Sequence, residues 1–193
     1  MARFLVFEGI DGSGKSSICR ALYKKMKRED IVLTMEPTKT WLGDAVKKSH
    51  HENVNPFTEA FLFMADRAAH SDKIKSWLEK GKTVLSDRYY HSTVAYQAAA
   101  LEGQTDFDVF SWLLSINRKI CVEPESVYYF KIEPKIALSR LKNRSGLSKF
   151  ENVEFLRKVS EYYDRLAEIS ENIVTIDAKR PQSSLVDELA RMF

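Results

Sequence analysis

Phe4-Leu5-Val6-Phe7-Glu8-Gly9-Ile10-Asp11-Gly12-Ser13-Gly14-Lys15-Ser16-Ser17 joins an apolar run to a glycine-rich turn and then to the start of a helical pattern. The turn matches G-x-x-x-x-G-K-[ST], which is typical of a phosphate-binding loop between a strand and a helix. Glycines reach backbone conformations closed to other residues, so successive N–H groups can converge on phosphate oxygens at the helix N-terminus. Lys15 adds a positive charge and Ser16 a hydroxyl for Mg²⁺. The stretch therefore predicts a phosphate-binding site, and the alternative is a glycine-rich turn with a surface lysine.

Composition limits the class of protein. At 193 residues and 44% hydrophobic content, the chain can bury one core and is too short for two ordinary domains, so we expect a single domain over residues 1–193. A net charge of +3 is too weak to indicate nucleic-acid binding by bulk electrostatics. No targeting motif or run of roughly 18 apolar residues is present, which predicts no membrane partner and a cytoplasmic location. Cys19 and Cys121 are expected to be small apolar fillers in a reducing compartment.

Strand-like and helix-like segments alternate along the chain. The strand candidates are Arg3–Glu8, Ile31–Met35, Thr83–Ser86, Ser126–Ile132 and Asn172–Ile176. Pro56 can open a long helix that reaches about Glu79, while Pro134 and Pro181 stand where further helices would begin. This alternation predicts an α/β fold with a five-stranded parallel sheet and helices on both faces, the three-layer α/β/α arrangement of P-loop NTPases.

Kinases, GTPases and ATPase motors all share such a sheet, and the residues after the third expected strand help to separate them. Asp87 falls at the C-terminal end of that strand, where open α/β sheets bind ligands, and could hold Mg²⁺ or its waters. A water-activating ATPase commonly carries a glutamate base next, whereas Arg88 suits a phosphate group. The guanine-reading motif N-K-x-D is absent from the sequence. These features favour a kinase, with a surface ion pair between Asp87 and Arg88 as the alternative.

The segment after Arg88 carries its polar side chains on one side of an expected helix, at spacings of three, four and seven: Tyr89, Ser92, Thr93, Tyr96 and Gln97. Hydroxyls, aromatic rings and an amide together can line a site that recognises a base and a sugar. Ordinary amphipathicity explains the pattern nearly as well. The position directly after Asp87 and Arg88 favours the binding site.

Phe63 and Arg67 lie one turn apart on the helix expected from Pro56. A ring beside a guanidinium can stack on a base while hydrogen-bonding its edge. Because this helix is apolar around most of its circumference, a purely structural Phe63 is an equal alternative. His70 is expected to be structural.

The segment from Arg140 to Lys149 holds four positive charges and no acid. Arg140 and Arg144 would share a helix face at i, i+4, an arrangement of like charges that costs stability unless an anion lies against it. Gly146 then breaks the helix, as a mobile flap requires. Two arginines closing over a triphosphate would neutralise transition-state charge. A solvated basic turn is the alternative interpretation.

Taken together, these residues resemble the thymidylate kinase family over nearly the whole chain. The carriers are Phe7 to Ser16, then Glu36-Pro37, Leu62-Phe63-Met64-Ala65-Asp66-Arg67, Asp87-Arg88-Tyr89, Ser92-Thr93, Tyr96-Gln97, the basic segment and Tyr162-Tyr163. The resemblance implies that Phe63 stacks on thymine, that Arg67 helps to hold the base and that Arg88 binds the acceptor phosphate. It further implies that Asp11 lies near sugar and phosphates, and that Tyr96 screens the 2′ position.

The family divides by the location of its catalytic arginine, in the phosphate loop or in the lid. Gly12 occupies the loop position here, so the chain resembles the lid-arginine branch, with a lid at about 140–151. Two positions depart from the family pattern. Met35 stands where many members have a phosphate-contacting arginine, with Lys39 as a candidate substitute, and the usual Asp-Arg-x-Glu of the lid is reduced to Ser148-Lys149-Phe150-Glu151.

The resemblance implies a kinase that uses ATP and Mg²⁺ to convert dTMP to dTDP, and a homodimer. The expected catalytic residues are Asp11, Lys15, Arg88, Arg140 and Arg144, and the metal ligands Ser16 and Asp87. The expected ATP-binding residues are Gly9, Ile10, Asp11, Gly12, Ser13, Gly14, Lys15, Ser16 and Ser17. The expected dTMP-binding residues are Glu36, Pro37, Phe63, Arg67, Arg88, Ser92, Thr93, Tyr96 and Gln97. Two alternatives remain: a kinase for another deoxynucleotide or deoxynucleoside, and a nonenzymatic nucleotide switch.

Overall fold

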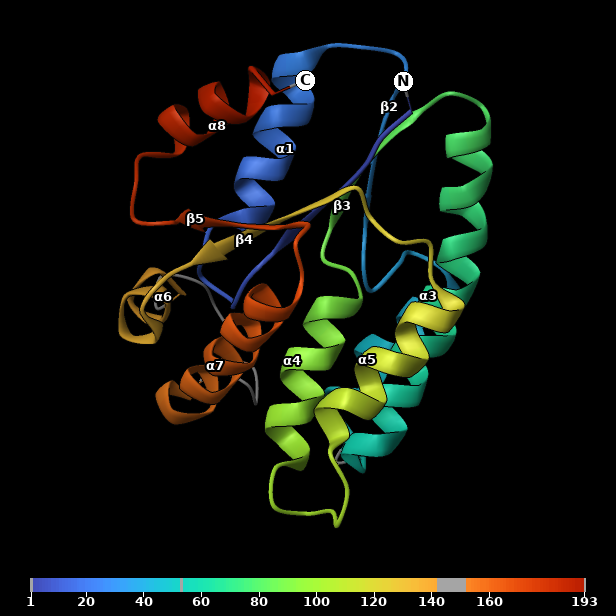
Figure 1. Ribbon diagram of the computed structural model, residues 1–193, viewed down its shortest axis with the longest axis vertical. Helices are drawn as coiled ribbons and strands as arrows, with labels where there is room; N and C mark the ends of the chain where they lie inside the picture. Colours follow the sequence, from blue (N-terminus) through green and yellow to red (C-terminus); the bar gives the residue numbers. More distant parts are fainter. Residues whose placement is uncertain (1, 53, 142–151, 193) are drawn as a thin grey trace.

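The centre of the molecule is a five-stranded parallel sheet with the strand order β2-β3-β1-β4-β5 (Figure 1). The computed structural model describes residues 2–52, 54–141 and 152–192. Its strands are β1 (Phe4–Glu8), β2 (Ile31–Met35), β3 (Thr83–Asp87), β4 (Ser126–Lys131) and β5 (Ile173–Asp177). The predicted α/β fold class is therefore confirmed.

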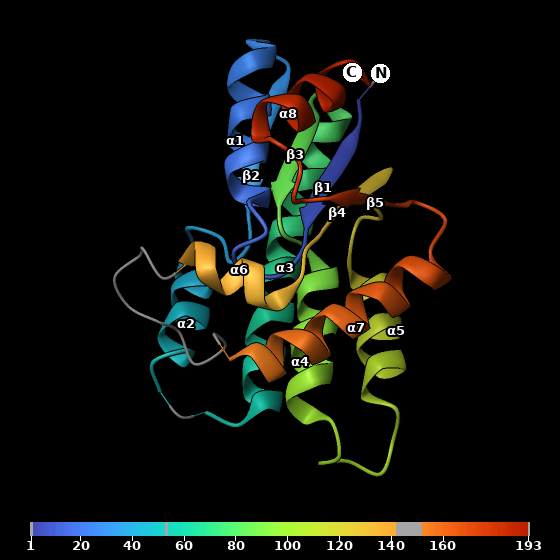
Figure 2. The same cartoon turned by 90° about the vertical axis from the view of Figure 1, so that its left-hand side faces the viewer.

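Helices cover both sides of this sheet. They are α1 (Lys15–Met26), α2 (Trp41–Ser49), α3 (Pro56–Glu79), α4 (Tyr90–Leu101), α5 (Val109–Ile120), α6 (Pro134–Leu141), α7 (Val153–Ile169) and α8 (Gln182–Ala190). Figure 1 shows α1 and α8 packed together on one side, with α3, α4, α5 and α7 on the other, and Figure 2 shows the same layers turned by 90°. None of the described helices combines the length and the apolarity needed to cross a membrane.

The central strands place two loops side by side. Every residue of β1 and β3 is buried, as expected for inner strands of a parallel sheet covered on both faces. In the ladder Phe7 pairs with Asp87, so the phosphate loop after β1 and the Asp87-Arg88 turn after β3 leave the sheet at the same edge. This is the edge at which open α/β sheets bind ligands.

The expected strand ends differ from the structure by about one residue. Strand β3 continues to Asp87 because Asp87 pairs with Phe7 and Met35 and its carbonyl accepts a hydrogen bond from the Glu36 N–H at 3.1 Å. The long helix matches its prediction at both ends. Asn55 accepts from the Phe57 N–H at 2.8 Å and Pro56 occupies the first turn, where a missing N–H costs nothing.

Helix α4 differs from a simple two-faced helix. Its residues are buried all round, apart from a half-buried Ala100, and Tyr90, Ser92, Thr93, Tyr96 and Gln97 are hydrogen-bonded to other elements. The stripe of polar residues that the sequence shows is therefore an internal network at the centre of the molecule.

Candidate active site

The phosphate loop has the backbone that its glycines predict. Gly12 and Gly14 have φ angles of 85° and 88°, and Gly14 is the N-cap of α1. A Cβ on Gly12 would lie 2.2 Å from the carbonyl oxygen of Ala137 on α6, so only glycine fits there. Ser13 donates its N–H to the Ile10 carbonyl at 3.2 Å, which closes the turn. The loop is thereby shaped to present N–H groups at a helix N-terminus.

A cavity of about 470 Å³ lies over this loop. One wall is the loop from Asp11 to Ser17 with Ile18, and the facing wall holds Arg140, Leu141 and the segment from Ala178 to Gln182. Arg140 also donates to the Ala178 carbonyl at 3.1 Å. The cavity can accept a triphosphate against the loop with its nucleoside toward the second wall. Arg144, Ser148 and the rest of the expected lid, 142–151, lie outside the described residues.

Lys15 lies beneath the loop with 4% of its surface exposed. Burial, and then the nearby charge of Arg88, lower its pKa to about 8, although Asp11, Asp87 and Glu8 act in the opposite direction. Its ammonium stands 3.9 Å from Asp11. Lys15 and Arg88 form a cationic centre that nearby carboxylates partly offset, and an incoming phosphate would further compensate the repulsion between the two cations.

Arg88 is the second cation of this centre. Its φ of 73° is in the left-handed region, which non-glycine residues rarely adopt. The guanidinium donates to Asp11 Oδ1 at 2.5 Å, to Ser92 Oγ at 2.8 Å and to the Gly9 carbonyl at 3.2 Å. The arginine from β3 is thus held against the phosphate loop, as the sequence predicts.

Asp11 and Tyr96 form the wall next to Arg88. The Tyr96 hydroxyl donates to Asp11 Oδ2 at 2.9 Å and accepts from the Asp11 N–H at 3.1 Å. Burial alone would raise the pKa of Asp11, but the charges of Arg88 and Lys15 and the Tyr96 hydrogen bond lower it well below its usual range. Asp11 is therefore a carboxylate at every physiological pH, and its side chain keeps 39% exposure.

Asp87 and Ser16 are the candidate metal ligands. Asp87 is 7% exposed, and its Oδ1 has no hydrogen-bond partner within the described part of the chain. An unsatisfied buried carboxylate oxygen at the phosphate end of the sheet suits a hard cation such as Mg²⁺. No cluster of three His, Cys, Asp or Glu suited to a metal occurs among the described residues.

A second cavity, of about 590 Å³, is lined by Asp87 and by residues of the outer strand β2. Met35 and Lys39 both line it, with Arg20 and Lys73 contributing two further cations. Lys39 is exposed and lies on the same cavity as Met35, where the family resemblance implies an arginine. The geometry keeps Lys39 as a candidate substitute for that arginine.

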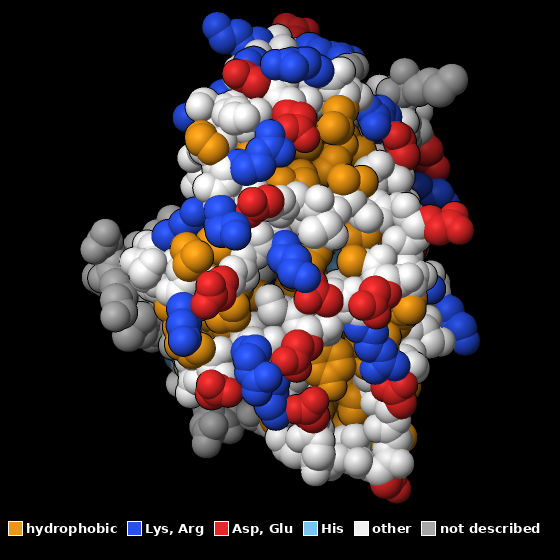
Figure 3. All heavy atoms as spheres, turned by 60° about the vertical axis from the view of Figure 1, so that its left-hand side comes forward, with side chains coloured by type: hydrophobic (Ala, Val, Ile, Leu, Met, Phe, Trp, Pro, Cys, Tyr) orange, Lys and Arg blue, Asp and Glu red, His pale blue; other side chains and the backbone are white. Residues whose placement is uncertain are grey.

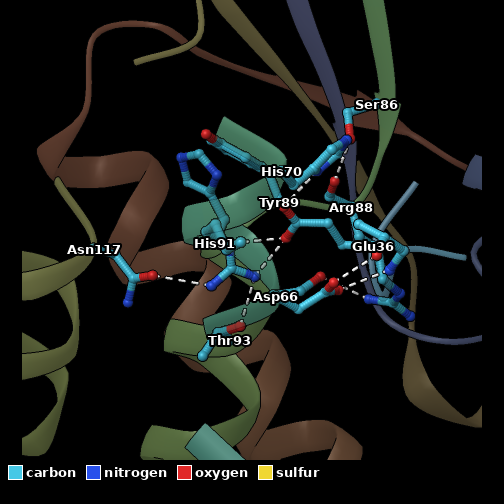
Figure 4. Close-up of polar contacts among 12 residues, drawn as sticks. Glu36, Asp66, His70, Ser86, Arg88, Tyr89, His91, Thr93 and Asn117 are labelled. Atoms are coloured by element: carbon cyan, nitrogen blue, oxygen red, sulfur yellow. Dashed lines mark hydrogen bonds and ion pairs between the residues drawn. The ribbon is translucent and has the colours of Figure 1, made fainter. Parts of the chain in front are cut away.

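Arg67 on α3 is buried in a polar network, and Figure 4 labels its partners Glu36, Thr93 on α4 and Asn117 on α5. Its guanidinium donates to Glu36 Oε2 at 2.8 Å, to Thr93 Oγ1 at 2.8 Å and to Asn117 Oδ1 at 2.9 Å. Glu36 also accepts from His70 Nδ1 at 2.9 Å, which assigns His70 the structural role expected of it. The predicted base contacts of Glu36, Arg67 and Thr93 stay predictions; in this structure Glu36 and Thr93 each accept a hydrogen bond from Arg67.

Asn117 was missed by sequence reasoning. It is fully buried on α5 and donates to the Leu113 carbonyl at 2.8 Å while accepting from Arg67. The only signal is one polar residue at a core position of an otherwise amphipathic helix, which does not identify a partner 50 residues away. A buried amide of this kind must be satisfied, and Arg67 satisfies it.

The remaining predicted nucleotide contacts lie on two helices. Phe63 is half-buried, with its ring centroid 5.8 Å from that of His50. The Gln97 amide donates to Glu59 Oε2 at 3.1 Å, and its own Oε1 has no partner among the described groups. Ser92 bonds to Glu8 and Arg88. Pro37 follows a cis peptide bond after Glu36.

A phosphate loop, two cations and a buried acid at the switch point of a parallel sheet define a P-loop phosphotransferase. Comparison with known proteins narrows this class. A family model described as Thymidylate kinase matches residues 7–189. A "Probable thymidylate kinase" from Methanosarcina barkeri is 39% identical over 98% of this chain and 94% of its own length. Proteins of the same description from Methanococcoides burtonii and Methanosarcina acetivorans are 39% and 40% identical, over 92% and 91% of this chain and 89% and 87% of their own.

The chain therefore belongs to the thymidylate kinase family, and it is an ATP-dependent nucleoside monophosphate kinase. The resemblance, the kinase class and the thymidylate kinase function predicted from the sequence are confirmed. The individual residue assignments, the lid-arginine branch and the single domain over 1–193 stay predictions.

Proposed function

We propose that this kinase transfers the γ-phosphoryl group of ATP to dTMP, with Arg88 holding the acceptor phosphate and Lys15 with the phosphate loop holding the donor. The observation that carries the proposal is the position of Arg88, which is bonded to Asp11 and to the Gly9 carbonyl of the phosphate loop. A cation between donor and acceptor sites can align two polyanions that would otherwise repel each other.

Transfer needs no general base in this proposal. The acceptor is already an anionic phosphate oxygen, so the protein has to align it and stabilise charge on the transferring group. Lys15 and the loop N–H groups neutralise charge on ATP, while Arg88 fixes the attacking oxygen. Arg140, which lines the donor cavity, and Arg144 are assigned to the transferring group.

Ser16 and Asp87 would hold Mg²⁺. When bound, this ion would neutralise phosphate charge between the donor groups and lower the barrier to displacement. The unpartnered Oδ1 of Asp87 supports the assignment, since the carboxylate has no other bonded group at that oxygen in the described structure.

We assign the binding of the thymidine part of dTMP to Phe63, Gln97 and Tyr96. Arg67 would hold the surrounding helices in place. Phe63 offers a half-buried ring, and Gln97 offers an amide oxygen without a described partner. A stacked ring and an amide together recognise a planar base with a polar edge.

The homodimer implied by the resemblance is part of the proposal. Aromatic rings from α3, α5 and the loop before α5 form a cluster at the surface, in which Phe57, Phe107 and Trp112 pack within about 6 Å of one another. Phe61 extends this cluster and is 53% exposed. A second copy of the chain would cover it, and light scattering of the native protein against Phe61→Asp tests this.

A cytoplasmic location is proposed because ATP and free nucleotides are available there.

Arg88→Ala tests the assignment that carries the proposal. Loss of an arginine that holds a reacting phosphate lowers kcat/KM by about a thousandfold or more. Arg157→Ala is the matched control, because the Arg157 side chain is exposed on the outer face of α7 and its ion pairs among the described residues are with Glu154 and Glu161. Unchanged kcat/KM for dTMP in Arg88→Ala would remove Arg88 from the site.

A further inference from the structure

Glu8 is a buried carboxylate with no part in the chemistry described so far. It is the last residue of β1, directly before the phosphate loop, and it is fully buried. Four groups donate to it: the Tyr89 N–H at 2.8 Å, the Ser92 N–H at 3.1 Å, the Ser92 hydroxyl at 2.6 Å and the Tyr163 hydroxyl at 2.8 Å. Burying a carboxylate is costly unless it is bonded in this way, so such a group needs a reason to be there.

The first effect of Glu8 is on the start of α4. The N-terminal N–H groups of a helix lack partners within the helix and are usually satisfied by the N-cap side chain. Tyr89 is the N-cap of α4 and makes no such bond. Glu8 supplies the cap from a different strand, and its negative charge also suits the positive end of the helix dipole.

The second effect is on the backbone of Arg88. The N–H of Arg88 donates to the Phe7 carbonyl at 3.0 Å, and the next N–H, that of Tyr89, donates to Glu8. The peptide groups before and after Arg88 are thus both anchored to the end of β1. This pair of anchors opposes relaxation of the unfavourable φ of 73° at Arg88.

The third effect is on the Arg88 side chain. Ser92 donates its hydroxyl hydrogen to Glu8 Oε2, which leaves the oxygen lone pairs for the Arg88 guanidinium, whose Nη1 lies 2.8 Å away. The carboxylate therefore sets the direction of the hydroxyl that receives Arg88.

We propose that Glu8 is a positioning residue for phosphoryl transfer, which holds Arg88 against the phosphate loop through the Tyr89 backbone and the Ser92 hydroxyl. The inference rests on the proposed role of Arg88 at the acceptor phosphate. Glu8 itself touches neither substrate. It couples the loop that holds the donor to the arginine that holds the acceptor, because one residue at the end of β1 borders both.

Two substitutions separate the parts of this contact. Glu8→Gln keeps the shape and leaves one oxygen for the two N–H groups, but it removes the charge and the acceptor that faces Ser92. Ser92→Ala keeps the carboxylate and both backbone bonds, and it removes the hydroxyl that links Glu8 to Arg88 together with the contact of that hydroxyl to Tyr163 Oη at 2.8 Å. We expect each to lower kcat for dTMP between about tenfold and a hundredfold, since small displacements of reacting groups have effects of this size. The Kd for ATP should stay within about twofold, because the phosphate loop keeps its own contacts.

The deciding measurement repeats both substitutions in an Arg88→Ala background. If Glu8 acts through Arg88, neither Glu8→Gln nor Ser92→Ala lowers the residual kcat further by more than about twofold, since coupled residues are not additive. If each substitution lowers kcat by the same factor in the wild-type and the Arg88→Ala background, Glu8 acts independently of Arg88 and the inference is overturned. Thermal unfolding of each variant identifies a loss of fold, in which case Ser92→Ala alone decides.

The two proposals fail in distinguishable ways. Arg88→Ala with a wild-type kcat would refute the role of Arg88 and this inference with it. A crippled Arg88→Ala beside wild-type kcat in Glu8→Gln and Ser92→Ala would leave the proposed function standing and refute only the positioning role.

Discussion

Replacing Arg67 by Met tests whether the buried network around this arginine stabilises the fold, and comparison with Arg88→Met distinguishes that role from a catalytic one. The guanidinium is 1% exposed, and it pairs with an equally buried Glu36. Met has a similar length and fills the space, but it leaves Glu36 with one charged or polar partner, His70. It also leaves the oxygens of Thr93 and Asn117 without their donor.

Removing one partner of a buried ion pair costs about 3–5 kcal/mol. In a domain of this size, each kcal/mol lowers Tm by about 2–4 °C, so Arg67→Met should lower Tm by about 6–20 °C. Arg88→Met is the matched comparison. Its partner Asp11 keeps 39% exposure, and removing Arg88 relieves its repulsion of Lys15, so the loss of stability should be smaller than that of Arg67→Met.

The assay is thermal unfolding of both variants beside steady-state kinetics with dTMP. Arg67→Met should show a large fall in Tm, and Arg88→Met a small one with a large fall in kcat/KM. Arg67→Met with a Tm within 2 °C of the wild type, on the scale expected for a surface change, would refute a structural role for the buried network.

Four further outcomes are expected. Because the pKa of Lys15 lies near 8 and not at 10.5, the Kd for ATP should rise as pH increases from about 7.5 to 9.5. Isothermal titration should find a weaker pH dependence of this Kd in Lys15→Arg, whose side chain stays charged. A Kd of the wild type that does not change with pH would contradict this. By the same shift, the unliganded protein should gain stability between about pH 8 and 10.5, where the unfolded chain binds more protons. Gly12→Ala should abolish most turnover, because its Cβ would lie 2.2 Å from a backbone oxygen. Gly81→Ala is the control: it has a similar φ of 74° but open space around it, so it should cost about 1 kcal/mol of stability and no activity. Equal kcat in the two variants would count against the loop geometry. Lys39→Ala should raise the KM for dTMP and Met35→Arg should lower it, and unchanged KM in both would exclude Lys39 as a substitute cation.

Much of the fold could be predicted because the local sequence signals for strands, turns and helices agreed with the alternation of strands and helices along the whole chain. The loop from Gly9 to Ser16 follows a strand and opens a helix, and Pro56 begins the helix that its position predicts. The residues that bring Arg88 to the loop were also recoverable, because parallel strands end at one edge of a sheet.

Pairings between distant residues could not be predicted in the same way. Arg67 meets Glu36, Thr93 and Asn117, which lie 31, 26 and 50 residues away along the chain. Periodicity shows which face of a helix a residue occupies, but it does not identify the helix packed against that face. Glu8 illustrates the same limit, since an acid at the end of a buried strand shows nothing in sequence of the four donors that satisfy it.

The most direct test of phosphoryl transfer to dTMP is ADP release from Mg-ATP, measured with and without dTMP and with thymidine, dUMP and dCMP as parallel acceptors. We predict release that depends on dTMP, with a turnover of roughly 1–100 s⁻¹. Protein that folds and binds ATP but releases no ADP in response to dTMP would contradict the proposed reaction, and faster release with another acceptor would assign the site to that acceptor.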